Sequence, residues 1–159
     1  MAVATLLGDV RKAFRDAWIA ALADPKVLVC LGHPGKQQPD DVVSIGDITI
    51  DATYGAMSSR RQRELTIVQE GIVSCFVRGG RDAEEKASDR ACLLLMTGEE
   101  YLRGDGTTVG NARTTLSGLV RECFLTHAGP AGGFDSAVSN VKGRVVEIPF
   151  AFTAKARIY

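Results

Sequence analysis

The chain has 159 residues, 45% of them hydrophobic and 24% charged, a composition that is typical of a folded protein and excludes disordered and fibrous classes. Two separate cores would each be marginal at this length, so we expect a single domain over residues 1–159. Lys plus Arg and Asp plus Glu number 19 each, and this balance argues against a protein that grips nucleic acid or an anionic membrane.

Cysteine and histidine usage predicts neither a metal site nor a cofactor. A structural zinc site would show two short Cys/His spacings, and this sequence has none. Each cysteine lies in an apolar run, so we expect reduced core residues in a protein made in a cytoplasm. No apolar stretch approaches the ~20 residues that span a bilayer, and we expect no membrane contact. The cysteines are Cys30, Cys75, Cys92 and Cys123.

The first predicted element is an amphipathic helix over residues 4–23, in which apolar side chains recur every three or four positions. Asp24-Pro25 ends it, because proline cannot continue the helical hydrogen bonds. Residues 26–31 form a β-branched run that predicts a short strand. The turn cluster Gly32-His33-Pro34-Gly35 follows it.

Two longer strands are predicted next, over residues 42–54 and 64–77. Gly46-Asp47 interrupts the alternation of the first, which favours a bulge or a tight hairpin. In the second, Leu65, Ile67, Val73, Cys75 and Val77 share one face, whereas Ile72 and Phe76 lie on the other. Apolar groups on both faces indicate that one side meets the core and the other meets a partner.

The second half of the chain predicts a helix over 82–102, a turn-rich loop over 104–113 and a strand over 114–127. Residues 128–143 are glycine-rich without periodicity, so we expect a long functional loop. The last strand, over 145–158, alternates cleanly between apolar and polar side chains. Pro149 within it favours an edge position or a bulge.

Taken together, these elements predict an α+β fold. We expect an antiparallel or mixed sheet of four to five strands, with the two amphipathic helices packed on one face.

Catalytic motifs are weak in this sequence. Gly79-Gly80-Arg81 lacks a Walker lysine, and no Gly-x-Ser-x-Gly elbow occurs. A hydrolase that uses Cys123 or His127 stays open as an alternative with little support. We therefore expect a non-enzymatic protein.

The chain resembles the tail terminator, or tail completion, proteins of long-tailed bacteriophages that infect actinobacteria. The similarity covers nearly the whole chain in order and spacing. The residues that carry it are Ala17-Trp18-Ile19-Ala20-Ala21-Leu22, Val29, Gly32-His33-Pro34-Gly35, Asp41-Val42-Val43-Ser44-Ile45-Gly46-Asp47-Ile48, Arg60-Arg61-Gln62-Arg63-Glu64, Arg78-Gly79-Gly80-Arg81-Asp82, Leu102-Arg103-Gly104-Asp105 and Ala156-Arg157-Ile158.

The resemblance implies a virion protein, assembled in the host cytoplasm, that forms a hexameric ring on the finished tail tube. Its partners would be further copies of itself, the major tail tube protein and a stopper protein of the head and neck. DNA would pass through the lumen without specific binding. Zero net charge suits such a lumen, because few phosphate contacts form.

Assembly contacts are expected on the outward face of strand 64–77 and in the loops. The basic cluster before that strand has two readings, a charged strand entry that discourages aggregation or a contact with a neighbour's carboxylates or with DNA. We expect residues 128–143, with 104–113, to become ordered only in the assembly. The candidate contact residues are Arg60, Arg61, Arg63, Ile72, Phe76, Asn111, Arg113, Phe134 and Lys142.

Two other functions stay open. A head-completion or stopper protein of the neck would have a more β-rich barrel and a weaker second helix. A small ligand-binding regulatory domain of ferredoxin-like build would need a formed apolar pocket with convergent polar groups.

Overall fold

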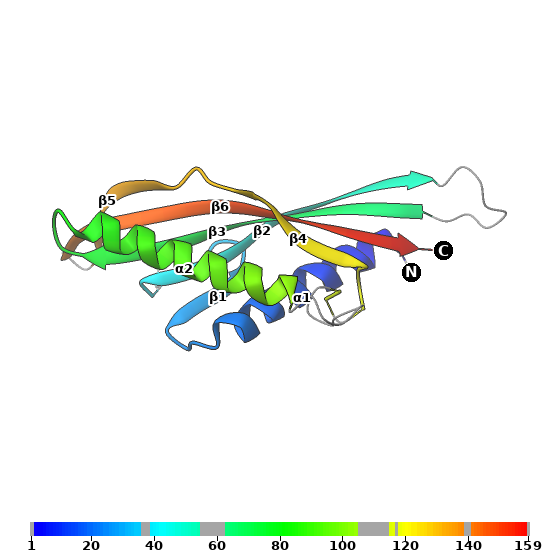
Figure 1. Ribbon diagram of the computed structural model, residues 1–159, viewed down its shortest axis with the longest axis horizontal. Coiled ribbons are helices and arrows are strands. Elements are labelled where there is room, and N and C mark those ends of the chain that lie inside the picture. Colours follow the sequence, from blue (N-terminus) through cyan, green and yellow to red (C-terminus); the bar gives the residue numbers. More distant parts are fainter. Residues whose placement is uncertain are drawn as a thin grey trace.

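The computed structural model shows one layer of helices on one layer of sheet (Figure 1). It describes residues 2–35, 39–54, 63–104, 115–116, 118–138 and 141–158. The elements are α1 (Val3–Leu22), β1 (Val27–Leu31), β2 (Asp41–Tyr54), β3 (Arg63–Arg78), α2 (Ala83–Arg103), β4 (Glu122–Ala128), β5 (Gly132–Val138) and β6 (Val141–Ile158).

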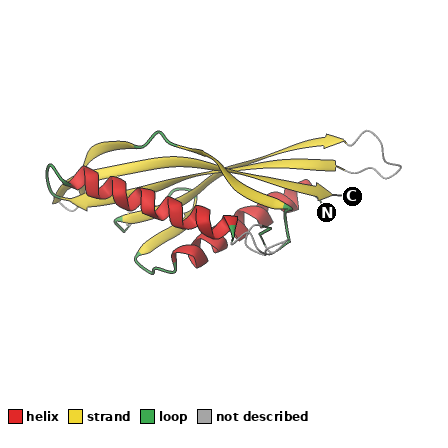
Figure 2. Cartoon of the chain, viewed as in Figure 1, coloured by secondary structure: helices red, strands yellow, loops and turns green. Residues whose placement is uncertain are grey.

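The sheet is mixed, with the strand order β1-β2-β3-β6-β4. Only β1 and β2 pair in parallel, and every other pairing is antiparallel. Strand β5 also pairs with β6, so that β4 and β5 follow one another along the same edge. The sheet is strongly twisted (Figure 2), as L-residues require. The predicted α+β class with a mixed sheet is confirmed.

Both helices cover the same face of the sheet. Helix α1 contacts β1 and β2, helix α2 contacts β3 and β6, and the helices contact each other. The predicted stripe of α1 and the predicted alternation of the last strand are therefore confirmed, because the large side chains that each element buries lie on the side facing the other layer. The fully buried side chains include Leu6, Val10, Phe14 and Trp18 of α1 and Phe150 and Phe152 of β6.

An aromatic cluster fills the centre of this core. The rings of Trp18 and Phe150 are stacked with centroids 5.3 Å apart, and Phe14 meets Phe152 edge-on at 5.0 Å. Such pairs contribute about 0.5–1.5 kcal/mol each beyond the area that they bury. Gly98 of α2 lies directly on the Trp18 ring, so this glycine sets how closely the helices approach.

The expectation of a long loop over residues 128–143 is wrong, because most of this segment is β5 and the start of β6. Its glycines permit close packing within the sheet. A Cβ at Gly143 would stand 2.5 Å from the Val77 carbonyl oxygen and the Phe76 ring, and one at Gly133 would collide with Glu84. The described residues of this segment therefore form strands within the single chain, whereas residues 105–113, expected to behave in the same way, lie outside the described residues.

Two further expectations need correction. Of the strand predicted over 114–127, only the second half is extended, because Leu116 and Gly118 adopt positive φ in a turn. Pro149 lies in a central strand and not at an edge, since β6 pairs with β3 on one side and with β4 and β5 on the other. Its carbonyl accepts from the Gly129 amide at the break between β4 and β5. Proline has no backbone N–H, and at Pro149 the nitrogen points toward this same break between β4 and β5. The sheet therefore loses no interstrand hydrogen bond there.

Candidate assembly surfaces

The face of the sheet opposite the helices carries a groove of about 470 Å³. Two irregular strands border it. The register of β2 shifts between Ile45 and Ile48, and the register of β4 shifts between Leu125 and His127. The bulge predicted at Gly46-Asp47 is therefore confirmed, and it bends β2. Residues that line the groove include Ser44, Asp47, Glu70, Ile72, His127 and Pro149.

The β2 bulge is held by side chains from two other elements. Gln69 of β3, the one buried polar residue among those described, donates its amide to the carbonyl oxygens of Gly46 and Asp47, each at 3.1 Å. Arg11 of α1 donates to the carbonyls of Gly46, at 3.1 Å, and Ile45, at 3.3 Å. Gly46 and Asp47 lie in the bulge, outside the regular pairing of β2 with β3, and a buried carbonyl without a donor is costly. The two side chains therefore fix the shape of the groove wall.

Replacing Gln69 by leucine is expected to lower the free energy of unfolding by about 2 kcal/mol, because it removes the side-chain donor of the Asp47 carbonyl inside the protein. The measurement is urea denaturation followed by circular dichroism. Gln69→Glu serves as the matched control for shape, and a carboxylate in this buried place should be at least as harmful. Full stability of Gln69→Leu would show that the amide does not hold the bulge.

Two residues predicted to share an outward face differ in how exposed they are. Ile72 is 40% exposed and lies in the groove, as expected for a contact residue. Phe76 is only 5% exposed, because its ring packs over Gly143 of β6. Phe76 therefore lies on the predicted face, but it is buried there and is not an exposed contact residue.

The remaining predicted contacts are spread over the molecule. Arg63 and Lys142 are exposed and lie at opposite ends of the paired strands β3 and β6. Phe134 belongs to β5, paired with Val145, and its side chain is not described. Arg60, Arg61, Asn111 and Arg113 lie outside the described residues.

Sequence reasoning missed four exposed apolar side chains, of which Ile19 of α1, at 50% exposed, is the first in the chain. Leu93 and Met96 of α2 are 55% and 48% exposed, and Phe124 of β4 is 42% exposed. Leu93 and Met96 lie three positions apart and outside the buried stripe of the helix, a signal that the sequence contained. The exposure of Phe124 was not predicted, because the strand was expected over 114–127, whereas β4 begins at Glu122. The chain therefore leaves apolar groups uncovered on both layers.

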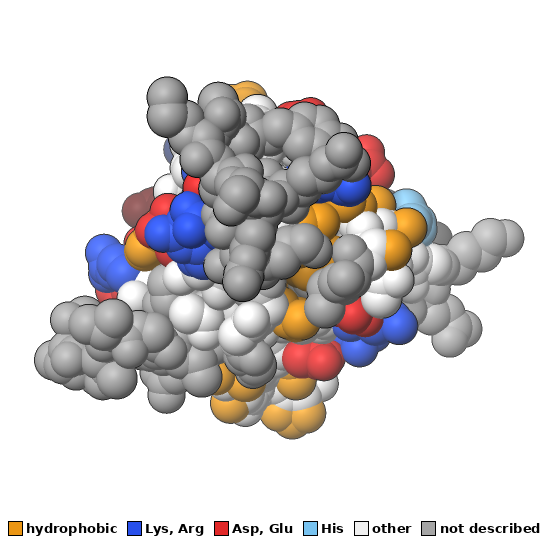
Figure 3. All heavy atoms as spheres, turned by 90° about the vertical axis from the view of Figure 1, so that its right-hand side faces the viewer, with side chains coloured by type: hydrophobic (Ala, Val, Ile, Leu, Met, Phe, Trp, Pro, Cys, Tyr) orange, Lys and Arg blue, Asp and Glu red, His pale blue; other side chains and the backbone are white. Residues whose placement is uncertain are grey.

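Charged side chains on the open sheet face are arranged in pairs. Arg157 donates to Glu64 at 2.6 Å, and its guanidinium holds the pKa of that carboxyl below its usual value. Lys155 donates to Thr66 across the same two strands. In the end view of Figure 3, acidic and basic side chains of the described residues alternate rather than gather by sign.

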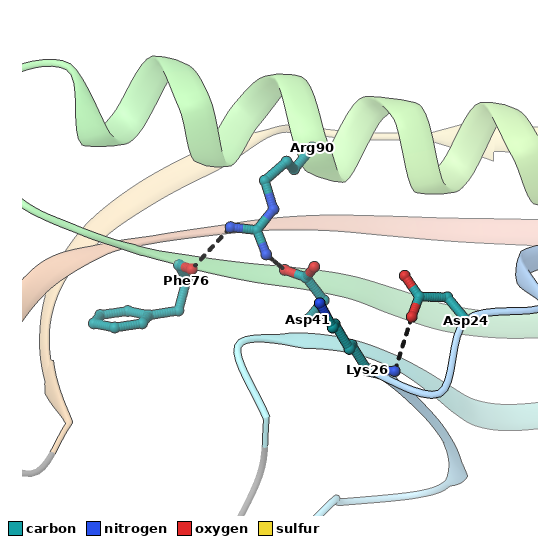
Figure 4. A network of polar contacts seen from close by, with 5 residues as sticks. All are labelled: Asp24, Lys26, Asp41, Phe76 and Arg90. Carbon is teal, nitrogen blue, oxygen red and sulfur yellow. Dashed lines mark hydrogen bonds and ion pairs between the residues drawn. The ribbon is translucent and has the colours of Figure 1, made fainter.

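One ion pair ties α2 to the start of β2. Arg90 donates to the Asp41 carboxylate and, at 3.5 Å, to the Phe76 carbonyl (Figure 4). In the turn between α1 and β1, the backbone amide of Lys26 donates to the Asp24 carboxylate at 2.9 Å. The contacts of Arg90 are structural, because they join α2 to strands β2 and β3.

Two of the four cysteines are buried thiols with a raised pKa. All four are free, and burial raises the pKa of Cys75 and of Cys123 to about 12. A thiolate at either position is therefore scarce near neutral pH. Cys92 is exposed, so the expectation of a core position is wrong for that residue. The His127 ring contacts the Gly129 carbonyl oxygen, with Nε2 at 3.0 Å.

No protein-family model matches the chain, and comparison with curated proteins finds no match. Within the described part of the chain, no three His, Cys, Asp or Glu side chains are grouped to hold a metal ion. Neither described helix is long and apolar enough to cross a membrane.

Proposed function

We propose that the chain is a structural subunit of a bacteriophage tail terminator, which forms a ring on the tail tube, stops its polymerisation and presents a docking surface for the head. Its partners would be further copies of itself, the tube protein and a neck protein, and it would act without catalysis. The proposal begins from the resemblance in the sequence, which spans both helices and the long central strands.

The observation that supports it best is the presence of two unlike uncovered surfaces on opposite layers. Ile72 and Phe124 lie on the open side of the sheet, whereas Leu93 and Met96 lie on the outer side of α2. Single exposed apolar residues are ordinary, but a head-to-tail ring needs two different contact surfaces on every subunit. A chain with apolar groups on both layers meets that requirement.

The alternatives receive less support. A neck stopper was expected to have a β-rich barrel and a weak second helix, whereas this sheet has open edges and α2 has 21 residues. A hydrolase that uses Cys123 would need a thiolate in a position where the thiol pKa is raised to about 12.

The test is the distribution of tail lengths in lysates of the encoding phage with this gene disabled, measured by negative-stain electron microscopy. We expect overlong tails of variable length beside unattached, filled heads. The matched control is the same phage complemented with the intact gene, which should restore one tail length.

Other results would contradict the proposal in different ways. Tails of normal length beside leaky or empty heads would move the protein to the neck. Particles with no alteration would exclude a role in assembly altogether.

A further inference from the structure

The described part of the sheet has two open edges. Strand β1 pairs only with residues 41–45 of β2, so residues 48–54 of β2 have β3 on one side and no described strand on the other. At the opposite edge, β4 pairs only with β6. Each open edge presents a row of backbone donors and acceptors, which is a template for pairing with another chain.

The β2 edge lacks the devices that usually block such pairing. Residues 48–54 contain no proline, glycine or lysine, and the register there runs without interruption. Thr49, Asp51, Ala52 and Thr53 are all exposed. Natural proteins protect edges with bulges, prolines and charges, and this one retains a single acidic side chain.

Strand direction decides which edge of a second copy fits. Strands β2 and β3, β3 and β6, and β6 and β4 are each antiparallel, so β4 runs opposite to β2. Copies in the same orientation, as in a ring, would therefore bring β4 of one against β2 of the next in an antiparallel pair. The helices of all copies would then lie on the same side of a continuous sheet.

Side chains select the register. Ile50 and Leu125 are half-buried aliphatic residues on the helix side of their respective edges, and both pack against the core from one direction only. Placing them opposite each other sets Asp51 opposite Phe124 on the open face. We propose that residues 48–54 of β2 pair with β4 of a second copy in this register. This inference rests on the proposed ring and names the contact that builds it.

The test is disulfide cross-linking of the purified chain with Asp51→Cys and Phe124→Cys in a Cys30→Ser, Cys92→Ser background, which leaves only the buried Cys75 and Cys123 as native thiols. Within one chain these positions lie three strand spacings apart, roughly 14 Å, so a bond between them must join two molecules. We expect oxidation to give a ladder of covalent oligomers beyond the dimer on a denaturing gel. A chain that carries only one of the two introduced cysteines can give dimers only. The control pair Asp51→Cys with Lys142→Cys should also stop at dimers.

A second variant probes the edge without cross-linking. Ala52→Lys places a charge on the β2 edge at an exposed position and should abolish oligomers in native mass spectrometry, while thermal unfolding of the monomer stays unchanged. The inference is overturned if the double-cysteine chain gives no more than dimers, or if Ala52→Lys leaves oligomers intact. Overlong tails in the gene-disabled lysate together with no ladder would remove this contact alone. A ladder beside unaltered particles would remove the tail function instead.

Discussion

Replacing Gly98 by alanine is expected to lower the free energy of unfolding by about 3 kcal/mol, at the upper end of the usual overpacking penalty. Helix propensity alone predicts the opposite sign, a gain of about 1 kcal/mol. The reason is the contact between the helices, where a Cβ at position 98 would stand 2.7 Å or less from three carbons of the Trp18 ring. That ring is completely buried and has no room to retreat. Urea denaturation followed by circular dichroism measures the change.

The chain offers a matched control and a rescue for this prediction. Gly8 lies in the other helix with nothing near its Cβ position, so Gly8→Ala should stabilise by about 0.5–1 kcal/mol. The three carbons involved belong to the outer ring of the indole, which a phenylalanine would not reach. Trp18→Phe with Gly98→Ala should therefore lose less than the sum of the two single losses. Additive losses would contradict the contact.

Gly71→Ala is expected to destabilise by a similar amount, about 3 kcal/mol. Gly71 lies on the helix side of central strand β3, where a Cβ would stand 2.8 Å from the Ser44 carbonyl oxygen and still closer to the Phe150 ring. The carbonyl belongs to the backbone of the neighbouring strand, so it can yield only if the sheet deforms. Alanine would otherwise favour a strand over glycine, and the measured sign separates the two effects.

Gly46 of β2 is the control for this second prediction. A Cβ there would lie 3.4 Å from the Glu70 carbonyl oxygen, which is an ordinary contact, so Gly46→Ala should change stability by less than about 1 kcal/mol. Equal losses at both positions would mean that glycine is needed throughout this part of the sheet, and not only where the Phe150 ring lies.

The sequence predicted those elements whose two sides differ in environment. Helix α1 has one buried side, and β6 alternates between core and open face, so apolar spacing alone located both. The bulge of β2 was visible because Gly46-Asp47 broke an otherwise regular alternation. In each case the pattern is local, which is why a single sequence was sufficient.

The same reasoning failed at glycines, because glycine occurs both in loops and at close contacts within strands and helices. A sequence alone does not distinguish these two uses. The glycines of residues 128–143 predicted a loop, yet Gly133 and Gly143 are in strands where a side chain would collide with Glu84 or Phe76. Gly98 appeared to weaken the end of α2, whereas it accommodates Trp18. Both outcomes depend on residues that are distant in the sequence.

Only part of the candidate surfaces could be predicted, because exposure also depends on residues that are distant in the sequence. Alternation correctly placed Ile72 on the open face, but the burial of Phe76 on that face results from its contact with Gly143, in the part of β6 that the sequence predicted to be a loop. Residues that meet a partner carry no local signature distinct from that of an exposed apolar residue. The contact residues could therefore be named only by position.

The place of β6 in the sheet has a consequence for the order in which the protein can fold. This strand is the last element in sequence, yet it lies between β3 and β4, and its pairing joins Arg63 to Ile158. Until it is synthesised, β3 has one unpaired side and the aromatic cluster lacks Phe150 and Phe152. Contacts at such sequence separation slow folding, and exposed strand edges invite aggregation. A nascent chain of this protein thus exposes one edge of β3 until β6 has emerged.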